Sequence, residues 1–324
     1  MSKFKVVISE CYYEDVDQET EILKGVDAEL VRCNCRTEED VIEAARGCDA
    51  LICQFAPISR KVIETLDNCK VIVRYAIGVD IIDLKAAEEK GIYACNVPDY
   101  CIDEVSNHAI ALLMDCARKL SYCAQQVKLG NTGYTAIQPL LRMEGKTLGL
   151  MGFGRIPKTV ARKMAGFGLN IIACDPYFDE KAGAQLGVRR VSFEELLEQS
   201  DYLSIHCPLT EETHHLFNAE AFAKMKSSAV LVNTARGAIV DERALIEALR
   251  THQIGMAGID VTETEPIRPD HPLLALDNAV VTPHIAWYTE ESVKSLQAKV
   301  AEEVARVLRG EKPLHAVNHP ERRA

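Results

Sequence analysis

Short apolar runs alternate with amphipathic stretches along the whole chain. The first series of runs reads FKVVIS, LVRC, DALICQ, VIVRY and IYACNV, and the second reads KTLGLMG, LNIIACD, SDYLSIHC, SAVLVNT, IGMAGIDV and NAVVTP. Such runs predict buried strands, and the polar stretches between them, such as TEEDVIEAARG, predict helices. Apolar strands that alternate with helices are typical of parallel sheets covered by helices on both faces.

A longer helix is predicted between the two series, from Asp99 to about Leu120. Its apolar residues recur at three- and four-residue spacing, which is the pattern of one buried helix face. They are Ile102, Val105, Ala109, Leu112, Leu113 and Cys116. The sequence contains no solenoid-length repeat and no low-complexity tract, so the pattern predicts an α/β protein with two parallel sheets.

Composition narrows the class of protein. The 324 residues are enough for two domains, and 48% hydrophobic with 26% charged residues is typical of a globular protein. No apolar run reaches the roughly 18–20 residues of a membrane span, and MSKFK is no signal peptide, so a cytoplasmic protein is expected. The net charge of -11 argues against direct nucleic-acid binding. Most of the twelve cysteines sit in apolar runs without metal-ligand spacing, so we expect buried, reduced thiols and no metal.

A glycine turn ends the first strand of the second series. KTLGLMG runs into GFGRIPKTVARKMAGFG, which places Gly152 and Gly154 between a strand and a helix. The next strand ends in Asp175, 21 residues after Gly154. At this spacing a carboxylate meets the ribose hydroxyls of NAD while the helix N-terminus holds the pyrophosphate. The third position of the fingerprint is Pro157 instead of glycine or alanine, and proline is tolerated in the first turn of a helix. The segment predicts an NAD site.

Three later strand ends carry residues suited to hydride transfer to a 2-oxo acid. Arg236 lies in NTARGAIVDE, Glu265 in GIDVTETEP and His284 in TPHIAW. A guanidinium grips a planar carboxylate at two points, and histidine is the usual proton donor near neutral pH. A carboxylate on the far ring nitrogen fixes the tautomer of such a histidine. The set predicts reduction of a carbonyl beside a carboxylate.

The remaining polar residues receive structural interpretations. His206, His214 and His215 are expected to shape a loop or to pack near the cofactor, and His108 to serve packing or an interface. The run DERALIEALRTHQ, residues 241–253, is interpreted as a solvated helix face.

These segments together resemble the D-isomer-specific 2-hydroxyacid dehydrogenases over nearly the whole chain. The matching stretches are RYAIGVDIIDLKAAEEKGI, NVPDYCIDEVSNHAIALLM, MEGKTLGLMGFGRI, HCPLTEETHHLF, NTARGAIVDE, GIDVTETEP and TPHIAW. The last of these, with PLLRMEGKTLG, looks closest to the C-terminal-binding-protein branch and its bacterial relatives. The resemblance implies two doubly wound parallel-sheet domains, a flavodoxin-like substrate domain and a Rossmann NAD domain, with the active site in the cleft. Residues 1–98 and 286–324 would form the substrate domain and 99–285 the NAD domain, through which members usually form homodimers.

The resemblance also implies roles for single residues. His284 would be the general acid/base, Glu265 its orienting partner and Arg236 the anchor of the substrate carboxylate. Asp260 would contact the nicotinamide carboxamide, and Trp287 would wall the substrate pocket. The expected cofactor set is Gly152, Gly154, Arg155, Ile156, Asp175, Cys207, Pro208, Thr213, Thr234, Ala235, Asp260 and Trp287. The expected substrate set is Arg74, Tyr75, Ala76, Ile77, Gly78, Arg236, His284 and Trp287.

The expected function is an NAD-dependent oxidoreductase that transfers a hydride between NADH and a small 2-oxo acid, with glyoxylate and hydroxypyruvate the first to try. Asp175, with no arginine after it, favours NADH over NADPH. Arg74 is the only cation in CQFAPIS and RYAIGVD, which disfavours a phosphorylated substrate. Two alternatives stay open: an NAD(H)-sensing, co-repressor-like interaction protein with little or no turnover, and a D-3-phosphoglycerate dehydrogenase. A formate dehydrogenase is disfavoured, because the partner of the histidine there is a glutamine.

Overall fold

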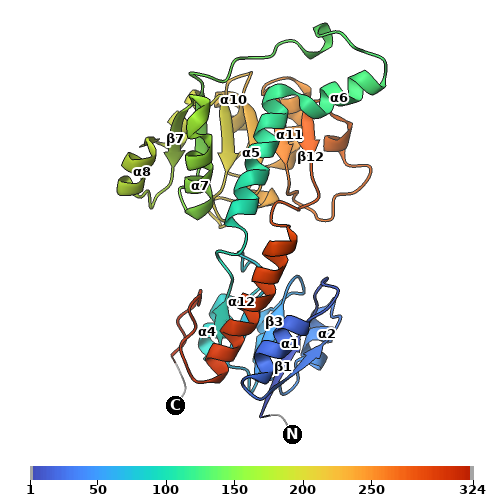
Figure 1. The fold of residues 1–324 in the computed structure, drawn as a ribbon, viewed down its shortest axis with the longest axis vertical. Coiled ribbons are helices and arrows are strands. Elements are labelled where there is room, and N and C mark those ends of the chain that lie inside the picture. The colour runs from blue at the N-terminus through green and yellow to red at the C-terminus, as the bar shows by residue number, and fades with distance from the viewer. Residues whose placement is uncertain (1–2, 322–324) are drawn as a thin grey trace. The chain divides into compact units, whose positions relative to one another are not determined.

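The chain forms two compact units in a computed structural model that describes residues 3–321. One unit consists of Met1–Cys101 together with Thr289–Ala324, and the other of Ile102–Tyr288. Each unit is a parallel sheet with helices on its faces (Figure 1). The predicted fold class, two parallel-sheet α/β domains, is therefore confirmed.

The first unit is built on a five-stranded sheet in the order β2-β1-β3-β4-β5, which is the flavodoxin-like order. β3 and β4 are buried at every position, as their apolar sequences predict. α2, α3 and α4 enclose one apolar core with the sheet, and α1 packs against α12 on the other face. The elements are β1 Phe4–Ile8, α1 Asp17–Lys24, β2 Ala28–Arg32, α2 Glu38–Ala44, β3 Ala50–Cys53, α3 Arg60–Glu64, β4 Val71–Arg74, α4 Leu84–Lys90, β5 Tyr93–Cys95 and α12 Glu290–Leu308.

The second unit is built on a seven-stranded sheet in the order β12-β11-β10-β9-β6-β7-β8. Its strands are β6 Thr147–Met151, β7 Asn170–Cys174, β8 Val188–Arg190, β9 Tyr202–Ile205, β10 Val230–Asn233, β11 Met256–Ile259 and β12 Ala279–Val281. β6 comes first in the chain but lies between β7 and β9, so the direction of the crossovers reverses beside it. In such sheets ligands bind beyond the carboxyl ends of the strands at this reversal.

Helices cover both faces of the second sheet. α5 and α7 share one apolar core with the sheet, and α9, α10 and α11 share another. The helices are α5 Ile102–Arg118, α6 Leu120–Lys128, α7 Arg155–Met164, α8 Glu180–Leu186, α9 Phe193–Gln199, α10 Ala219–Lys224 and α11 Glu242–Arg250, with 3-10 turns η1 Thr135–Ile137, η2 Ala165–Phe167, η3 Gly237–Ile239 and η4 Pro272–Ala275. Among residues 3–321, no helix has both the length and the apolar character that a membrane crossing requires.

The structure differs from the sequence prediction at the long helix, at α6, which was not predicted, and at β8. The predicted long helix begins at Ile102 instead of Asp99, and its buried residues include five of the six expected ones, with Ile102 half-buried. β8 was not predicted, because its sequence VRR is short and two of its three residues are exposed. An edge strand of this kind lacks the apolar pattern by which the buried strands are recognised.

Candidate active site

The glycine turn after β6 is crowded by backbone at its first glycine, Gly152. Gly152 has a φ of +100°, and a Cβ there would lie 3.1 Å from the backbone of both His206 and Cys207, which follow β9. The glycine thus lets the β6 and β9 ends come together at the reversal of the sheet. Gly154 precedes α7, whose N-terminus has no side-chain cap, and open space lies where its Cβ would be.

Pro157 fits into this turn without the loss of a hydrogen bond. It is the third residue of α7, and the first intrahelical bond runs from the Lys158 amide to the Gly154 carbonyl at 3.2 Å. The amide that proline lacks precedes that bond and would have no helical partner. The N-terminal amides of α7 therefore stay available for an anion.

Asp175 is fixed beside the glycine turn. Its Oδ2 accepts the Phe153 amide at 2.6 Å, and its Oδ1 accepts the Tyr177 amide at 2.7 Å. The carboxylate follows β7, next to β6 in the sheet. The 21-residue spacing thus corresponds to a direct contact between the aspartate and the glycine turn.

The neighbouring strand ends complete an edge that fits a dinucleotide. Thr234, directly after β10, has a buried hydroxyl with no hydrogen-bond partner among the described residues. After β9, the Thr213 hydroxyl accepts the Thr210 amide and donates to the Pro208 carbonyl, both at 2.7 Å, which closes the loop that begins with Cys207. An orphaned hydroxyl, an uncapped helix N-terminus and an anchored carboxylate thus follow β10, β6 and β7 of one parallel sheet, and together they fit a dinucleotide.

His284 and Glu265 are in direct contact. The Nδ1 of His284 lies 2.6 Å from Glu265 Oε2, and both side chains are about one-third exposed, at 37% and 36%. Glu265 is oriented in turn by the Thr262 amide, which donates to its Oε1 at 3.2 Å. With Nδ1 engaged by the carboxylate, Nε2 is the ring nitrogen that a proton transfer would use.

The turn that carries His284 is held by the buried carboxylate of Asp260. Asp260 Oδ1 accepts the Thr282 hydroxyl at 2.5 Å and the Ile285 amide at 3.0 Å, and its Oδ2 accepts the Ala286 amide at 2.9 Å. His108 from α5 lies 3.4 Å from Oδ1. Burial raises the pKa of Asp260, but the hydrogen bonds from His108, Thr282, Ala286 and Ile285 outweigh burial and lower it. The side chain thus acts on the His284 turn as an anion, and its contact with the nicotinamide stays a prediction.

Arg236 begins a turn that presses against the loop of Glu265. Asn233, at the end of β10, donates from Nδ2 to the Arg236 carbonyl at 2.9 Å. At the next residue, a Cβ on Gly237 would lie 2.0 Å from the carbonyl carbon of Thr262. Only glycine permits this backbone approach, so the Arg236 and Glu265 loops are in van der Waals contact.

The predicted substrate residues of the first unit are tied into that unit. The guanidinium of Arg74 is 8% exposed and donates to the carbonyls of Gln54 and Gly78 and to Asp80 Oδ1, each at 3.0 Å. Tyr75 is 2% exposed, and its hydroxyl donates to Glu19 Oε1 at 2.6 Å. The carbonyls of Ala76 and Ile77 accept from the Val97 amide and from Asn96 Nδ2. Hydrogen bonds thus hold this segment within the first unit, and its guanidinium is paired with Asp80.

The other histidines include one contact beside the candidate site that the sequence did not reveal, between His108 and Asp260. His206 is neutral at pH 7, because burial lowers its pKa to about 3. His108 was expected to serve packing or an interface, yet it supports Asp260. The interpretation of residues 241–253 as a solvated face is wrong for Glu242, whose side chain is 19% exposed and bonded to His271. Among residues 3–321, no group of three His, Cys, Asp or Glu side chains is placed to hold a metal ion.

Comparison with known proteins gives a consistent assignment. The family model of the D-isomer specific 2-hydroxyacid dehydrogenase NAD binding domain matches residues 110–286, more than half of the chain. A glyoxylate reductase of Korarchaeum cryptofilum is 41% identical over 283 residues, which cover 86% of this chain and 85% of that protein. A D-3-phosphoglycerate dehydrogenase of Methanocaldococcus jannaschii is 37% identical over 98% of this chain, which spans 60% of its length. A hydroxypyruvate reductase of Thermotoga maritima is 35% identical over 95% of this chain and 99% of its own.

Solved structures agree with the sequence relatives. A glyoxylate reductase of Paecilomyes thermophila is 29% identical and superimposes with a TM-score of 0.89 over 98% of this chain and 99% of its own. A D-lactate dehydrogenase of Aquifex aeolicus, solved with NAD and lactic acid, is 27% identical with a TM-score of 0.87 over 98% of this chain and all of its own. The chain therefore belongs to the D-isomer specific 2-hydroxyacid dehydrogenase family and is an NAD-dependent oxidoreductase.

Proposed function

We propose that this enzyme reduces a small, unphosphorylated 2-oxo acid, with glyoxylate and hydroxypyruvate as the first candidates. The observation that carries the proposal is the 2.6 Å contact between His284 Nδ1 and Glu265 Oε2, which follow β12 and β11 in the sheet that carries the NAD fingerprint after β6. Relatives named glyoxylate reductase and hydroxypyruvate reductase support the substrate class.

The proposed roles follow from the chemistry of the side chains. Bound NADH supplies the hydride that reaches the carbonyl carbon. Arg236 binds the substrate carboxylate, and His284 gives a proton from Nε2 to the carbonyl oxygen, so the product is the 2-hydroxy acid. Glu265 keeps the Nδ1 proton in place and stabilises the imidazolium before the transfer. In the reverse direction His284 takes the same proton back.

The charges of the first unit support an unphosphorylated substrate. Arg74 is the cation of the predicted substrate segment, and its guanidinium is paired with Asp80. In the loop after β3, the amides of Gln54, Phe55 and Ala56 all donate to the buried carboxylate of Glu10. These amides are therefore occupied by an anion of the protein itself, and a dianionic phosphate near them would lack compensation.

A turnover assay with NADH tests this function. Glyoxylate, hydroxypyruvate and phosphorylated hydroxypyruvate are compared at equal concentrations, and kcat/KM is measured for each. We expect the unphosphorylated acids to be reduced at least about tenfold more efficiently, which corresponds to about 1.4 kcal/mol. A higher kcat/KM for the phosphorylated compound would favour the second candidate, a D-3-phosphoglycerate dehydrogenase, which the 37% identity to such an enzyme supports. No turnover of any 2-oxo acid would contradict the proposal.

We also propose that the enzyme is a homodimer. The segment that begins with α6 supports this, because α6 has no buried residue and Figure 1 shows it at the margin of the second unit. Four large apolar side chains of the segment are more than half exposed: Leu120, Val127, Leu129 and Tyr134. Several large exposed apolar side chains within one segment favour a protein interface there.

A further inference from the structure

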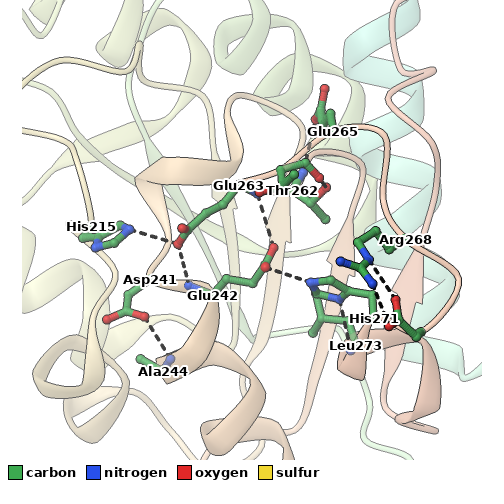
Figure 2. A network of polar contacts seen from close by, with 12 residues as sticks. His215, Asp241, Glu242, Ala244, Thr262, Glu263, Glu265, Arg268, His271 and Leu273 are labelled. Carbon is green, nitrogen blue, oxygen red and sulfur yellow. Dashed lines mark hydrogen bonds and ion pairs between the residues drawn. The ribbon is translucent and has the colours of Figure 1, made fainter.

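Beside the loop of Glu265, two glutamate carboxylates each accept a hydrogen bond from the backbone amide of the other glutamate (Figure 2). The amide of Glu242, the first residue of α11, donates to Glu263 Oε1 at 3.0 Å, and the amide of Glu263 donates in return to Glu242 Oε2 at 3.3 Å. A histidine closes each end. His215 Nε2 lies 2.9 Å from Glu263 Oε1, and His271 Nε2 lies 2.8 Å from Glu242 Oε1. We call these four residues the carboxylate brace.

The brace joins the two loops that carry Arg236 and Glu265. Glu263 lies two residues before Glu265, and its neighbour Thr262 donates its amide to Glu265 Oε1. Glu242 follows the turn that starts at Arg236, and Gly237 of that turn touches Thr262. The brace thus adds hydrogen bonds between the Arg236 and Glu265 loops where their backbones are already in contact.

Each histidine of the brace has a second contact besides its carboxylate. The Leu273 amide donates to His271 Nδ1 at 3.3 Å, so Nδ1 is an acceptor and Nε2 is the ring nitrogen that donates to Glu242. His215 stacks on His214 with ring centroids 4.0 Å apart. Among the described residues, no lysine or arginine forms an ion pair with Glu242 or Glu263.

The charged neighbours in Figure 2 are committed to other contacts. Asp241 caps α11 by accepting the Ala244 amide at 3.1 Å, and Arg268 pairs with Asp270 at 3.1 Å. The two carboxylates of the brace are therefore hydrogen-bonded by the backbone amides of Glu242 and Glu263 and by the two histidines. Removal of one carboxylate leaves the opposite amide and histidine without their acceptor.

We propose that Glu242 and Glu263 are positioning residues, which set the Glu265 loop so that its carboxylate meets His284. The inference rests on the proposed roles of His284 and Glu265. A carboxylate displaced by about 1 Å from a catalytic group costs up to about 10²-fold in rate, so a support two residues away has a measurable effect. The brace itself contacts neither substrate nor cofactor and acts through Glu265 alone.

The test compares Glu263→Ala with Glu263→Gln. Glutamine keeps an oxygen that accepts the Glu242 amide and the His215 proton, whereas alanine removes both contacts. For Glu263→Ala we expect kcat to fall about 10- to 100-fold, while NADH affinity, followed by the fluorescence of bound NADH, stays within about twofold. For Glu263→Gln we expect kcat within about threefold of the unmodified enzyme. Glu247→Ala, an exposed glutamate paired with Arg250 on the same helix, is the matched control and should change neither quantity.

The pH profile separates positioning from a general loss of stability. Glu265→Gln is expected to lower the upper pH limit of 2-oxo acid reduction, because the imidazolium loses its anionic partner. If the brace acts through Glu265, Glu263→Ala moves the limit in the same direction, and Glu263→Ala in the Glu265→Gln background moves it no further. If Glu263→Ala does not fold, His271→Asn replaces it, because asparagine still caps η4 but no longer donates to Glu242.

The outcomes distinguish the inference from the proposed function. A folded Glu263→Ala enzyme with unchanged kcat and pH limit overturns the inference. Equal losses in Glu263→Ala and Glu263→Gln also overturn it, because the charge and not the placement of the loop would then matter. If Glu265→Gln itself leaves the pH limit unchanged, the proposed role of Glu265 fails instead.

Discussion

His284 has a left-handed backbone, with a φ of 55°, which is costly for a residue with a Cβ. Its own hydrogen bonds sustain this conformation. The amide donates to the Asp260 carbonyl at 2.8 Å, and the carbonyl accepts the indole N–H of Trp287 at 3.0 Å. The predicted aromatic neighbour thus supports the histidine turn directly. A substitution that tests the chemistry of His284 must preserve this backbone.

Asparagine meets that requirement, because it tolerates the left-handed region. For His284→Asn we expect kcat to fall about 10²- to 10⁴-fold through the loss of the proton donor, with NADH affinity nearly unchanged. Steady-state kinetics and an NADH titration measure the two effects. His252→Asn is the control, since His252 is exposed and has the same φ of 55°. A His284→Asn enzyme that retains a tenth of its turnover would exclude His284 as the acid.

The position of the Asp175 carboxylate predicts which nicotinamide cofactor the enzyme prefers. This carboxylate is anchored by the Phe153 and Tyr177 amides, so it cannot turn away from a 2'-phosphate without losing both bonds. We expect kcat/KM with NADH to exceed that with NADPH by about 100-fold or more, because like charges repel at close range. Asp175→Asn removes the charge and should narrow the ratio at least about tenfold. Equal efficiency with both cofactors in the unmodified enzyme would contradict this reading.

At the scale of elements, the loops after β10 and β11 can approach each other because Gly237 has no side chain. Gly237→Ala places a Cβ about 2.0 Å from the Thr262 backbone, where no flexible side chain can yield. We expect a loss of about 1–3 kcal/mol in stability, the usual cost of overpacking, and a fall in kcat, because the Arg236 and Glu265 loops must separate. Thermal unfolding and turnover measure these effects. Gly166→Ala is the control, since its Cβ would meet nothing within 4 Å. A Gly237→Ala enzyme as stable and active as this control would show that the loops adapt freely.

At the scale of the whole molecule, the exposed apolar side chains around α6 lead to a prediction about assembly. We expect the 35.9 kDa chain to sediment as a dimer, and the double substitution Val127→Glu with Leu129→Glu to yield the monomer by burying charge at the interface. Gln125→Glu, an exposed change on the same helix, should leave the dimer intact. Analytical ultracentrifugation decides between the two states. A dimer that survives the double substitution would place the interface elsewhere.

We expect the acid stability of the molecule to depend on His206, a half-buried and neutral histidine. Burial lowers the pKa of His206 to about 3, whereas an unfolded histidine titrates near 6.5. Below pH 6.5 the unfolded chain therefore takes up a proton that the folded chain does not, so stability is lost as the pH falls from about 6.5 towards 3. At pH 5 this amounts to up to about 2 kcal/mol.

His206→Gln tests this linkage, because the glutamine amide takes the place of Nε2 opposite the Ser204 hydroxyl, 2.8 Å away. We expect the drop in Tm between pH 7 and pH 5 to shrink by roughly 4–8 °C relative to the unmodified protein. His319→Gln, at an exposed position, should leave the drop unchanged. An identical drop in Tm for the unmodified protein and His206→Gln would show that carboxylates alone control acid unfolding.

The buried strands, the NAD fingerprint and the candidate catalytic residues of this protein can be identified from local sequence. The buried strands were predicted because a strand covered on both faces is apolar throughout. β8 was not predicted because an edge strand can carry polar residues. The NAD fingerprint was recognised from Gly152, Gly154 and Asp175, since a strand-turn-helix unit has a nearly constant length. Arg236, Glu265 and His284 stood out because each follows an apolar strand, and parallel strands end at one edge of the sheet.

Only the tertiary structure decided which of these groups touch. The contact between Glu265 and His284, the support of Asp260 by His108, and the pairing of Glu242 with Glu263 join residues 19 to 152 positions apart. No local pattern encodes such pairs, which is why Glu242 was mistaken for part of a solvated face and the pairing of Arg74 with Asp80 was not predicted. The reason is physical: a charged side chain has the same sequence signature whether water or another loop satisfies it, and only the packing of the loops chooses between the two.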